Sequence, residues 1–308
     1  MTLSTKLSNL TIKAFEKTWE VNLPVIEQLG KASRNQFKTN IKVGDELDFI
    51  MPPEITVSAY DGTLSEQKLT NNNIKIVCNQ AWYYDFVLDD TETEFLNVIE
   101  NEYAPILTQG IKNATEKFSA KREKSLANLI TQSGFNLNSS SKYNAAGYTT
   151  PTTPIAVTQA NVKIIIHQIR AILFDGQKID GVPRSSWTQG KMLLYVPPAF
   201  EALLVGTGDM KYTELGVGKQ IQGYIGSYAG FDIITTNFIE ADSSGYYQIF
   251  ACTEGETFGT IMKKNLTSEK LRATLFIGDI FRGLGIFGVG MVRRDKAATA
   301  YVSVAFTA

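Results

Sequence analysis

One arm-like segment, residues 41–88, constrains the fold of this chain more than any other feature. Its first half, 41–60, is strand-like, and Asp61-Gly62 then gives a turn signal followed by residues too polar to bury. The chain returns through 74–88, where apolar residues alternate as in one continuing second strand. A two-stranded arm with a solvated tip has little core of its own and is marginal in isolation. We therefore expect the arm to lie on something else, which favours assembly over catalysis.

The arm leads directly into a long helical pattern. Asp89 and Asp90 offer N-cap oxygens, and further acids follow in the first turn, where the helix dipole favours anions. Apolar residues then recur every three or four positions from Phe95 to Ile130, which gives one apolar stripe. Pro105 lacks an N–H, so we expect a kink or break there, with roughly 40 Å of helix after it at about 1.5 Å per residue. A single stripe predicts that one face packs on a sheet while the other meets solvent or a neighbour.

Composition excludes several classes of protein. The 308 residues are 44% hydrophobic and 20% charged, which is ordinary for a folded protein with a proper core. The net charge of −1 gives no basic field for binding nucleic acid. Neither a signal peptide in the first ten residues nor an apolar run of membrane-spanning length is visible, so we expect a protein made in a cytoplasm. Cys78 and Cys252 lie in apolar, strand-like sequence, which favours buried free thiols over a disulfide.

Basic residues near the arm have two possible roles. Lys31, Arg34, Lys38 and Lys42 follow one another at three- and four-residue spacing with no acid between them. They either form a solvated face or contact an acidic surface, and 85–102 supplies seven acids and no basic residue. A contact between these basic residues and the acidic segment of a neighbouring subunit would give each charged group a partner of opposite sign.

The second half of the chain reads as a separate mixed unit. A Ser-, Asn-, Thr- and Pro-rich connector at 135–159 puts a boundary near Thr150. The patterns predict a helix at 161–174, a strand at 191–196 stopped by two prolines, a short helix at 199–205, and strands at 231–236, 246–252, 257–262 and 298–306.

The case for an enzyme is thin. His167 is the only histidine and lies in a mostly apolar helix, which favours a core or interface residue over a catalytic one. One histidine and two distant cysteines cannot build the usual zinc sites. The acids at Asp89 and Asp90 are explained by helix capping better than by a metal cluster.

Two glycine patterns resemble nucleotide-binding loops. Residues 283–288 fit Gly-x-Gly-x-x-Gly, but no helix pattern follows them and too little chain remains for a dinucleotide domain. We therefore favour a glycine-rich strand packed tightly in a sheet. The pattern around 216–220 fails as a P-loop, because Thr213 occupies the first glycine position and Gln220 replaces Ser/Thr.

The order of the segments resembles that of the major capsid proteins of tailed double-stranded-DNA phages, the HK97-like fold. The residues that carry the resemblance are 43–60, 86–90, the strand, prolines and helix of 193–204, and 226–237. The resemblance implies an α+β fold with an N-terminal arm, an extended β-hairpin E-loop, a long spine helix, a peripheral-domain sheet and an axial domain. The boundaries that we expect are 1–42 for the arm, 43–90 for the E-loop, 91–150 for the spine helix and peripheral domain, 151–254 for the axial domain, and 255–308 for the return to the peripheral domain.

The resemblance also implies a function without catalysis, cofactor or metal. Such a chain forms hexamers and pentamers of an icosahedral virion shell around double-stranded DNA, without sequence-specific binding and without a membrane. Scaffolding, portal and decoration proteins are the expected partners, and assembly takes place in the host cytoplasm. The inter-subunit contacts that we expect are Lys31, Arg34, Lys38, Asp61, Gly62, Glu66, Lys68, Asp89 and Asp90.

Three other functions remain open at this point. An encapsulin-like shell around protein cargo would use the same fold. A nucleotide-dependent enzyme would use a glycine-rich loop. A phage tail or adhesion protein would form fibres or tubes instead of closed particles.

Overall fold

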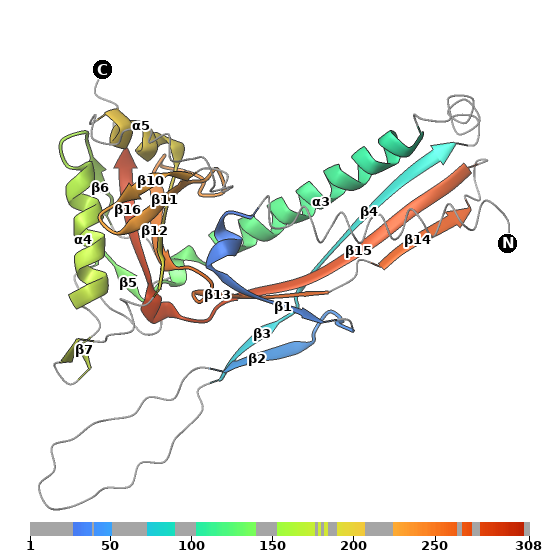
Figure 1. Ribbon diagram of the computed structural model, residues 1–308, viewed down its shortest axis with the longest axis horizontal. Coiled ribbons are helices and arrows are strands. Elements are labelled where there is room, and N and C mark those ends of the chain that lie inside the picture. Colours follow the sequence, from blue (N-terminus) through green and yellow to red (C-terminus); the bar gives the residue numbers. More distant parts are fainter. Residues whose placement is uncertain are drawn as a thin grey trace, which may run out of the picture.

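The chain folds around two β-sheets with helices on their faces, as an α+β protein (Figure 1). A sheet with helices packed on it forms one end, and a long helix and long strands project from it together. This computed structural model describes residues 27–38, 40–50, 73–89, 103–139, 153–175, 178–179, 182–183, 190–206, 224–263, 267–272 and 278–304. The loop tip with Asp61, Gly62, Glu66 and Lys68, the residue Asp90 and the pattern at 213–220 lie outside these ranges.

The seven-stranded sheet has the order β10-β11-β9-β12-β16-β5, with β6 also paired to β16. Its strands are β5 (Phe135–Asn136), β6 (Ile155–Val157), β9 (Met192–Val196), β10 (Tyr224–Tyr228), β11 (Phe231–Thr235), β12 (Tyr247–Thr253) and β16 (Ala297–Val304). The strands predicted around 191–196, 231–236, 246–252 and 298–306 are thereby confirmed. β16 joins this sheet, although its place in the sequence favoured the other one.

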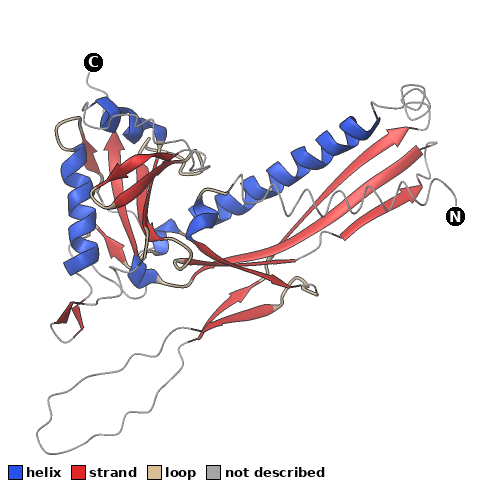
Figure 2. Ribbon diagram, in the orientation of Figure 1, coloured by secondary structure: helices blue, strands red, loops and turns tan. Residues whose placement is uncertain are grey.

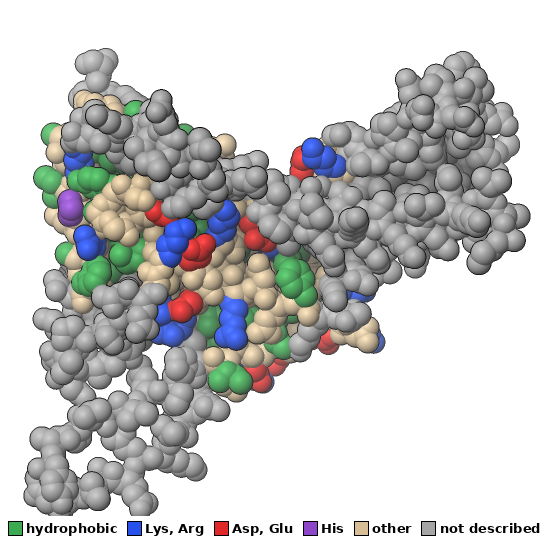
Figure 3. Space-filling view, in the orientation of Figure 1, with side chains coloured by type: hydrophobic (Ala, Val, Ile, Leu, Met, Phe, Trp, Pro, Cys, Tyr) green, Lys and Arg blue, Asp and Glu red, His purple; other side chains and the backbone are tan. Residues whose placement is uncertain are grey.

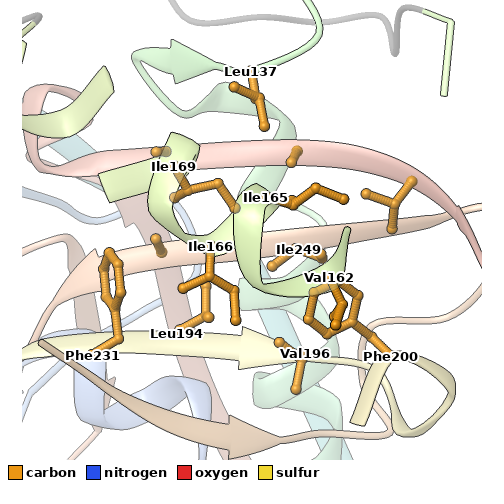
Figure 4. Packing of buried hydrophobic residues seen from close by; sticks show 14 of the residues in the cluster. Leu137, Val162, Ile165, Ile166, Ile169, Leu194, Val196, Phe200, Phe231 and Ile249 are labelled. Carbon is orange, nitrogen blue, oxygen red and sulfur yellow. The ribbon is translucent and has the colours of Figure 1, made fainter. Parts of the chain in front are cut away.

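Side chains alternate between the two faces of this sheet along each strand, and both faces are buried. Leu194 and Val196 of β9 pack under the helices α4 (Val162–Asp175) and α5 (Pro198–Gly206), as Figure 4 shows. Leu193 and Tyr195 point to the opposite face, where they meet the short helix η1 (Leu29–Ala32) and the other sheet. Near-continuous apolar strands such as β9 are what a sheet covered on both faces requires.

The five-stranded sheet has the order β1-β13-β15-β14, and β4 pairs with the opposite edge of β15. Its strands are β1 (Ser33–Lys38), β4 (Gln80–Asp89), β13 (Phe258–Lys263), β14 (Thr267–Arg272) and β15 (Gly278–Met291). β15 is the central strand, and its 14 residues pair with three others. β1 runs parallel to β13, and the remaining pairs are antiparallel.

Glycines in β15 leave space for close neighbours on both faces of the strand. The ring of Tyr84 occupies the space where a Cβ on Gly283 would be. On the other face, a Cβ on Gly288 would overlap the backbone at Val77, and one on Gly290 would press on Ile76. The glycine-rich segment is thus an interior strand, as favoured from the sequence, and 283–288 is not a nucleotide-binding loop.

The base of the arm is a two-stranded hairpin that packs on this sheet. β2 (Glu46–Ile50) pairs with β3 (Asn73–Val77), and Phe49 and Ile76 lie in a buried cluster with Ile261 and Ile286. Two expectations were therefore wrong. The base of the arm has a core within its own subunit, and the chain does not continue the arm beyond β3, because β4 leaves it to pair with β15. Both cysteines are free and buried, as expected.

The long helix α3 (Tyr103–Ala127) lies along the other face of the same sheet (Figure 2). Phe118 packs with Met262 and Phe287, and Tyr84 meets the Phe118 ring edge-on at 6.4 Å. Pro105 does not interrupt the helix, because it lies in the first turn, where a missing N–H leaves no helical bond unmade. The helix ends at Ala127, earlier than its apolar stripe suggested, and a short 3₁₀ turn, η2 (Ile130–Gln132), follows. Among the described helices, none is long and apolar enough to cross a membrane.

The close approach at Gly288 predicts a large effect of one added methyl group. Gly288→Ala should lower the free energy of unfolding by about 1–3 kcal/mol, since the hairpin backbone must shift. Gly110→Ala is the matched control, because Gly110 is helical and a Cβ there meets nothing within 4 Å. It should stabilise the protein by about 0.5–1 kcal/mol. Chemical denaturation of both variants checks this, and equal effects would contradict the packing of the hairpin on β15.

Candidate assembly surfaces

The described residues contain no group of three or more His, Cys, Asp or Glu side chains able to hold a metal ion. His167 is exposed on α4, where its Nε2 lies 3.2 Å from the Tyr228 hydroxyl. Figure 3 shows the histidine at the surface, with acidic and basic side chains interspersed on that face. The expectation of a core residue was therefore wrong for His167, and an interface role stays a prediction.

A buried ion cluster fixes the first described residues against α3. Arg122 and Glu123 are almost fully buried, and Arg122 Nη2 lies 3.2 Å from Glu123 Oε1 and 2.6 Å from Glu27 Oε1. Glu123 Oε2 accepts a hydrogen bond from the Leu29 N–H at 2.6 Å, and Oε1 accepts one from Gly30 N–H at 3.1 Å. A side chain at position 30 would collide with Arg122 and Glu123.

Burial and its neighbours act on the pKa of Glu123 in opposite directions. Burial raises the pKa of this carboxyl, while the Arg122 guanidinium and the Leu29 and Gly30 amides oppose the rise. The Tyr195 hydroxyl donates to the Gln28 carbonyl at 2.7 Å, and burial raises the pKa of that phenol as well. This cluster therefore joins η1, α3 and the seven-stranded sheet, and it sets where β1 begins.

No element of the described part of the chain covers the outer part of the five-stranded sheet on the face opposite α3. Pairing of β4 with β15 puts Tyr83 opposite Leu284 and Asp85 opposite Arg282. Tyr83 is 76% exposed and Leu284 36%, and Leu271 of β14, on the same face, is 40% exposed. We call this surface, made by Tyr83, Asp85, Val87, Leu271, Arg282 and Leu284, the open sheet face. Contiguous exposed apolar residues rimmed by charge are typical of an interaction surface.

The side of β4 that faces α3 differs in character. Lys121 Nζ lies 4.6 Å from the centre of the Trp82 ring, a cation–π arrangement. The Ser125 hydroxyl lies 3.2 Å from the Gln80 side-chain oxygen. The outward face of α3 carries exposed lysines, of which Lys124 forms an ion pair with Glu240 at 2.8 Å. This side is solvated and polar, so it is a poorer candidate for a subunit contact.

The structure separates the contact residues that the sequence suggested. Lys31 is half-buried in η1, and burial lowers the pKa of its ammonium group. Arg34 is exposed on β1, Lys38 is the last residue of β1, and Asp89 is the last residue of β4. Within the subunit β1 pairs with β13, and β4 pairs with β15. Strand pairing therefore does not join the basic residues of β1 to the acidic residues of β4.

Sequence reasoning missed the open sheet face and the buried ion cluster. The first had a visible signal, because both faces of β4 carry aromatic or apolar residues although only one is covered by α3. The second had none, since Arg122 and Glu123 stand in a run of charged residues that reads as solvent-exposed.

Comparison with solved structures supports the fold across most of the chain. The asymmetric unit of the mature capsid of bacteriophage PhiM1 matches with 14% sequence identity and a TM-score of 0.59, over 91% of this chain and 88% of that one. The capsid of Ralstonia phage GP4 matches with 11% identity and a TM-score of 0.59, over 90% and 89%. A virus-like particle from Pyrococcus furiosus matches with 12% identity and a TM-score of 0.53, over 94% and 98%. No family model and no curated protein sequence matches the chain.

The raised pKa of Glu123 predicts a pH-dependent contribution to stability. The folded protein keeps this proton to higher pH than the unfolded chain, whose ordinary value is 4.5, so the contribution falls as pH rises from 4.5 through the folded pKa. Glu123→Gln removes the titration with little change of shape. The urea midpoint of the parent, relative to this variant, should therefore fall as the pH is raised above 4.5. Glu116→Gln, at an exposed residue, is the control, and its urea midpoint should follow that of the parent. A parent midpoint that rises relative to that of Glu123→Gln as the pH rises would contradict the raised pKa of Glu123.

Proposed function

We propose that this chain is a major capsid protein that self-assembles into the icosahedral head of a tailed phage and encloses its double-stranded DNA. The observation that carries the proposal is the match in fold to phage capsid structures over about nine-tenths of both chains. Matching over nearly the full length of each partner favours the same role over reuse of one shared domain. No catalytic step is required of the chain, and we propose that it is not an enzyme.

The parts of the chain correspond to the HK97-like plan in the following way. We assign α3 as the spine helix, the β2–β3 hairpin with residues 51–72 as the E-loop, and the five-stranded sheet as the peripheral domain. The seven-stranded sheet with α4 and α5 is the axial domain. This assignment departs from the boundaries drawn from the sequence at four strands, because β1 and β4 join the five-stranded sheet and β5 and β16 join the seven-stranded sheet.

The open sheet face supports assembly on physical grounds. Tyr83, Leu284 and Leu271 leave apolar area in solvent that a neighbouring copy can bury. Each contact need contribute little, because repetition around a closed particle adds weak contacts through avidity. The net charge of −1 suits a wall that encloses DNA without binding it tightly. Scaffolding, portal and decoration proteins, and assembly in the host cytoplasm, belong to the same proposal.

A second candidate is an encapsulin-like cargo shell. The match to the virus-like particle from Pyrococcus furiosus supports it, since this fold is not confined to phage heads. A protein or peptide bound inside purified particles would favour the cargo shell, whereas packaged DNA would favour the phage head. The nucleotide-dependent enzyme has lost its main support, because 283–288 lies within β15.

Purified full-length chain should form rings or closed particles as its concentration rises. The reason is the apolar area of the open sheet face, which a second copy can bury. Light scattering and negative-stain microscopy over a range of salt concentrations measure this. A monodisperse monomer under all of these conditions, with scaffold added or not, would contradict the proposed function.

The polar tip of the arm should matter for assembly and not for folding. Replacing residues 63–72 with a short Gly-Ser turn should leave circular dichroism and the melting temperature close to those of the parent, because β2 and β3 keep their own core. Particles should fail to form or should be fragile, since the tip, with Glu66 and Lys68, is expected to lie on a neighbouring subunit. Intact particles of parental stability would show that this loop is not an inter-subunit arm.

A further inference from the structure

In the described part of the chain, β1 and β4 lie at opposite edges of the five-stranded sheet, and each has an open outer edge, as has β14. β1 pairs only with β13, and β4 pairs only with β15. Within the described part of the chain, no other strand and no further backbone hydrogen bond joins either outer edge. β4 is ten residues long and β1 is six. An open edge of this length is a template for pairing with another chain.

The two edges carry opposite charge. Arg34 is exposed on β1, and the sequence from Gln28 to Val43 contains no acid. Asp85 is exposed on β4, and the sequence from Gln80 to Tyr103 contains no basic residue. An edge of one sign cannot pair favourably with a copy of itself, because like charges placed side by side repel. Opposite charge instead favours pairing of the β1 edge with the β4 edge.

The side chains of both strands are arranged for such a pairing. On β1, the buried contact of Ser33 with Thr260 at 2.6 Å marks the side facing α3, so Phe37 lies on that side and Arg34 on the other. On β4, Trp82 lies on the α3 side beneath Lys121, and Asp85 lies on the other side. Phe37 is 50% exposed and Trp82 is 38% exposed.

We propose that the β1 edge of one copy adds to the β4 edge of the next copy, so that the five-stranded sheet continues across the subunit boundary. Within one subunit β1 and β4 run in the same direction, so with the same faces aligned the added strand runs parallel to β4. Arg34 then lies beside Asp85 on the open sheet face. The inference rests on the proposed function and names the contact that function needs.

A second copy fits these edges better than an unrelated partner. Both halves of the contact lie on this chain, at opposite edges of one sheet. Each copy can therefore donate β1 on one side and accept it on the other. A head-to-tail contact of this kind closes into rings when the rotation between copies allows it.

Charge reversal tests the contact in the full-length chain. Arg34→Glu and Asp85→Arg should each reduce the particle yield at fixed concentration by at least about tenfold, because each places like charges across the boundary. The double variant Arg34→Glu with Asp85→Arg should restore most of the yield, since it reverses the pair as a whole. Lys117→Glu is the matched control, because Lys117 is exposed on α3 and lies on neither edge. It should assemble like the parent.

Both residues are exposed, so circular dichroism should show all variants folded. Single variants that assemble like the parent, or a double variant no better than either single one, would overturn the edge pairing while leaving the shell function intact. A loss of yield in Lys117→Glu equal to that in Arg34→Glu would also overturn it, because the effect would then be one of net charge. A parent chain that forms no particles would contradict the shell function and the edge pairing together.

Discussion

The close approach of two elements to opposite faces of β15 is the constraint on which the rest of the structure depends. Gly288 and Gly290 admit the β2–β3 hairpin on one side, and Gly283 leaves space for Tyr84 beneath α3 on the other. Once α3 is fixed on the sheet, its buried Arg122 and Glu123 hold the backbone at Leu29 and Gly30. Those residues lead into β1 and contact the seven-stranded sheet through Tyr195. Packing at one strand thereby determines how the two sheets and the start of the described chain are joined.

The distribution of apolar residues separates folding from assembly. The seven-stranded sheet is covered on both faces, and the inner part of the five-stranded sheet lies between α3 and the hairpin. The outer part, with Tyr83 and Leu284, keeps apolar area in solvent. The cores of such a subunit stabilise its fold, and its exposed residues can form weak contacts that repeat between subunits. Such contacts suit a closed shell, where each is made many times and none must be strong.

The sequence predicted the elements whose pattern is local and missed those fixed by distant pairing. The stripe of α4 and the apolar run of β9 are readable because period and burial agree within each segment. β1 was not predicted, because Ser-Arg-Asn-Gln-Phe-Lys has no alternation; it is a strand through parallel pairing with β13, far away in the sequence. The destination of β4 and the burial of Arg122 and Glu123 depend on β15 in the same non-local way. Among the contact residues suggested from the sequence, Arg34 is exposed on an open edge.

A three-dimensional reconstruction of the assembled particles by electron cryo-microscopy tests the central claim most directly. The account predicts closed icosahedral shells in which every copy has its open sheet face covered by the same part of a neighbour. Tyr83 and Leu284, exposed in the single subunit, should be buried at that contact. Fibres or tubes, or closed shells in which these two side chains still face solvent, would contradict the account.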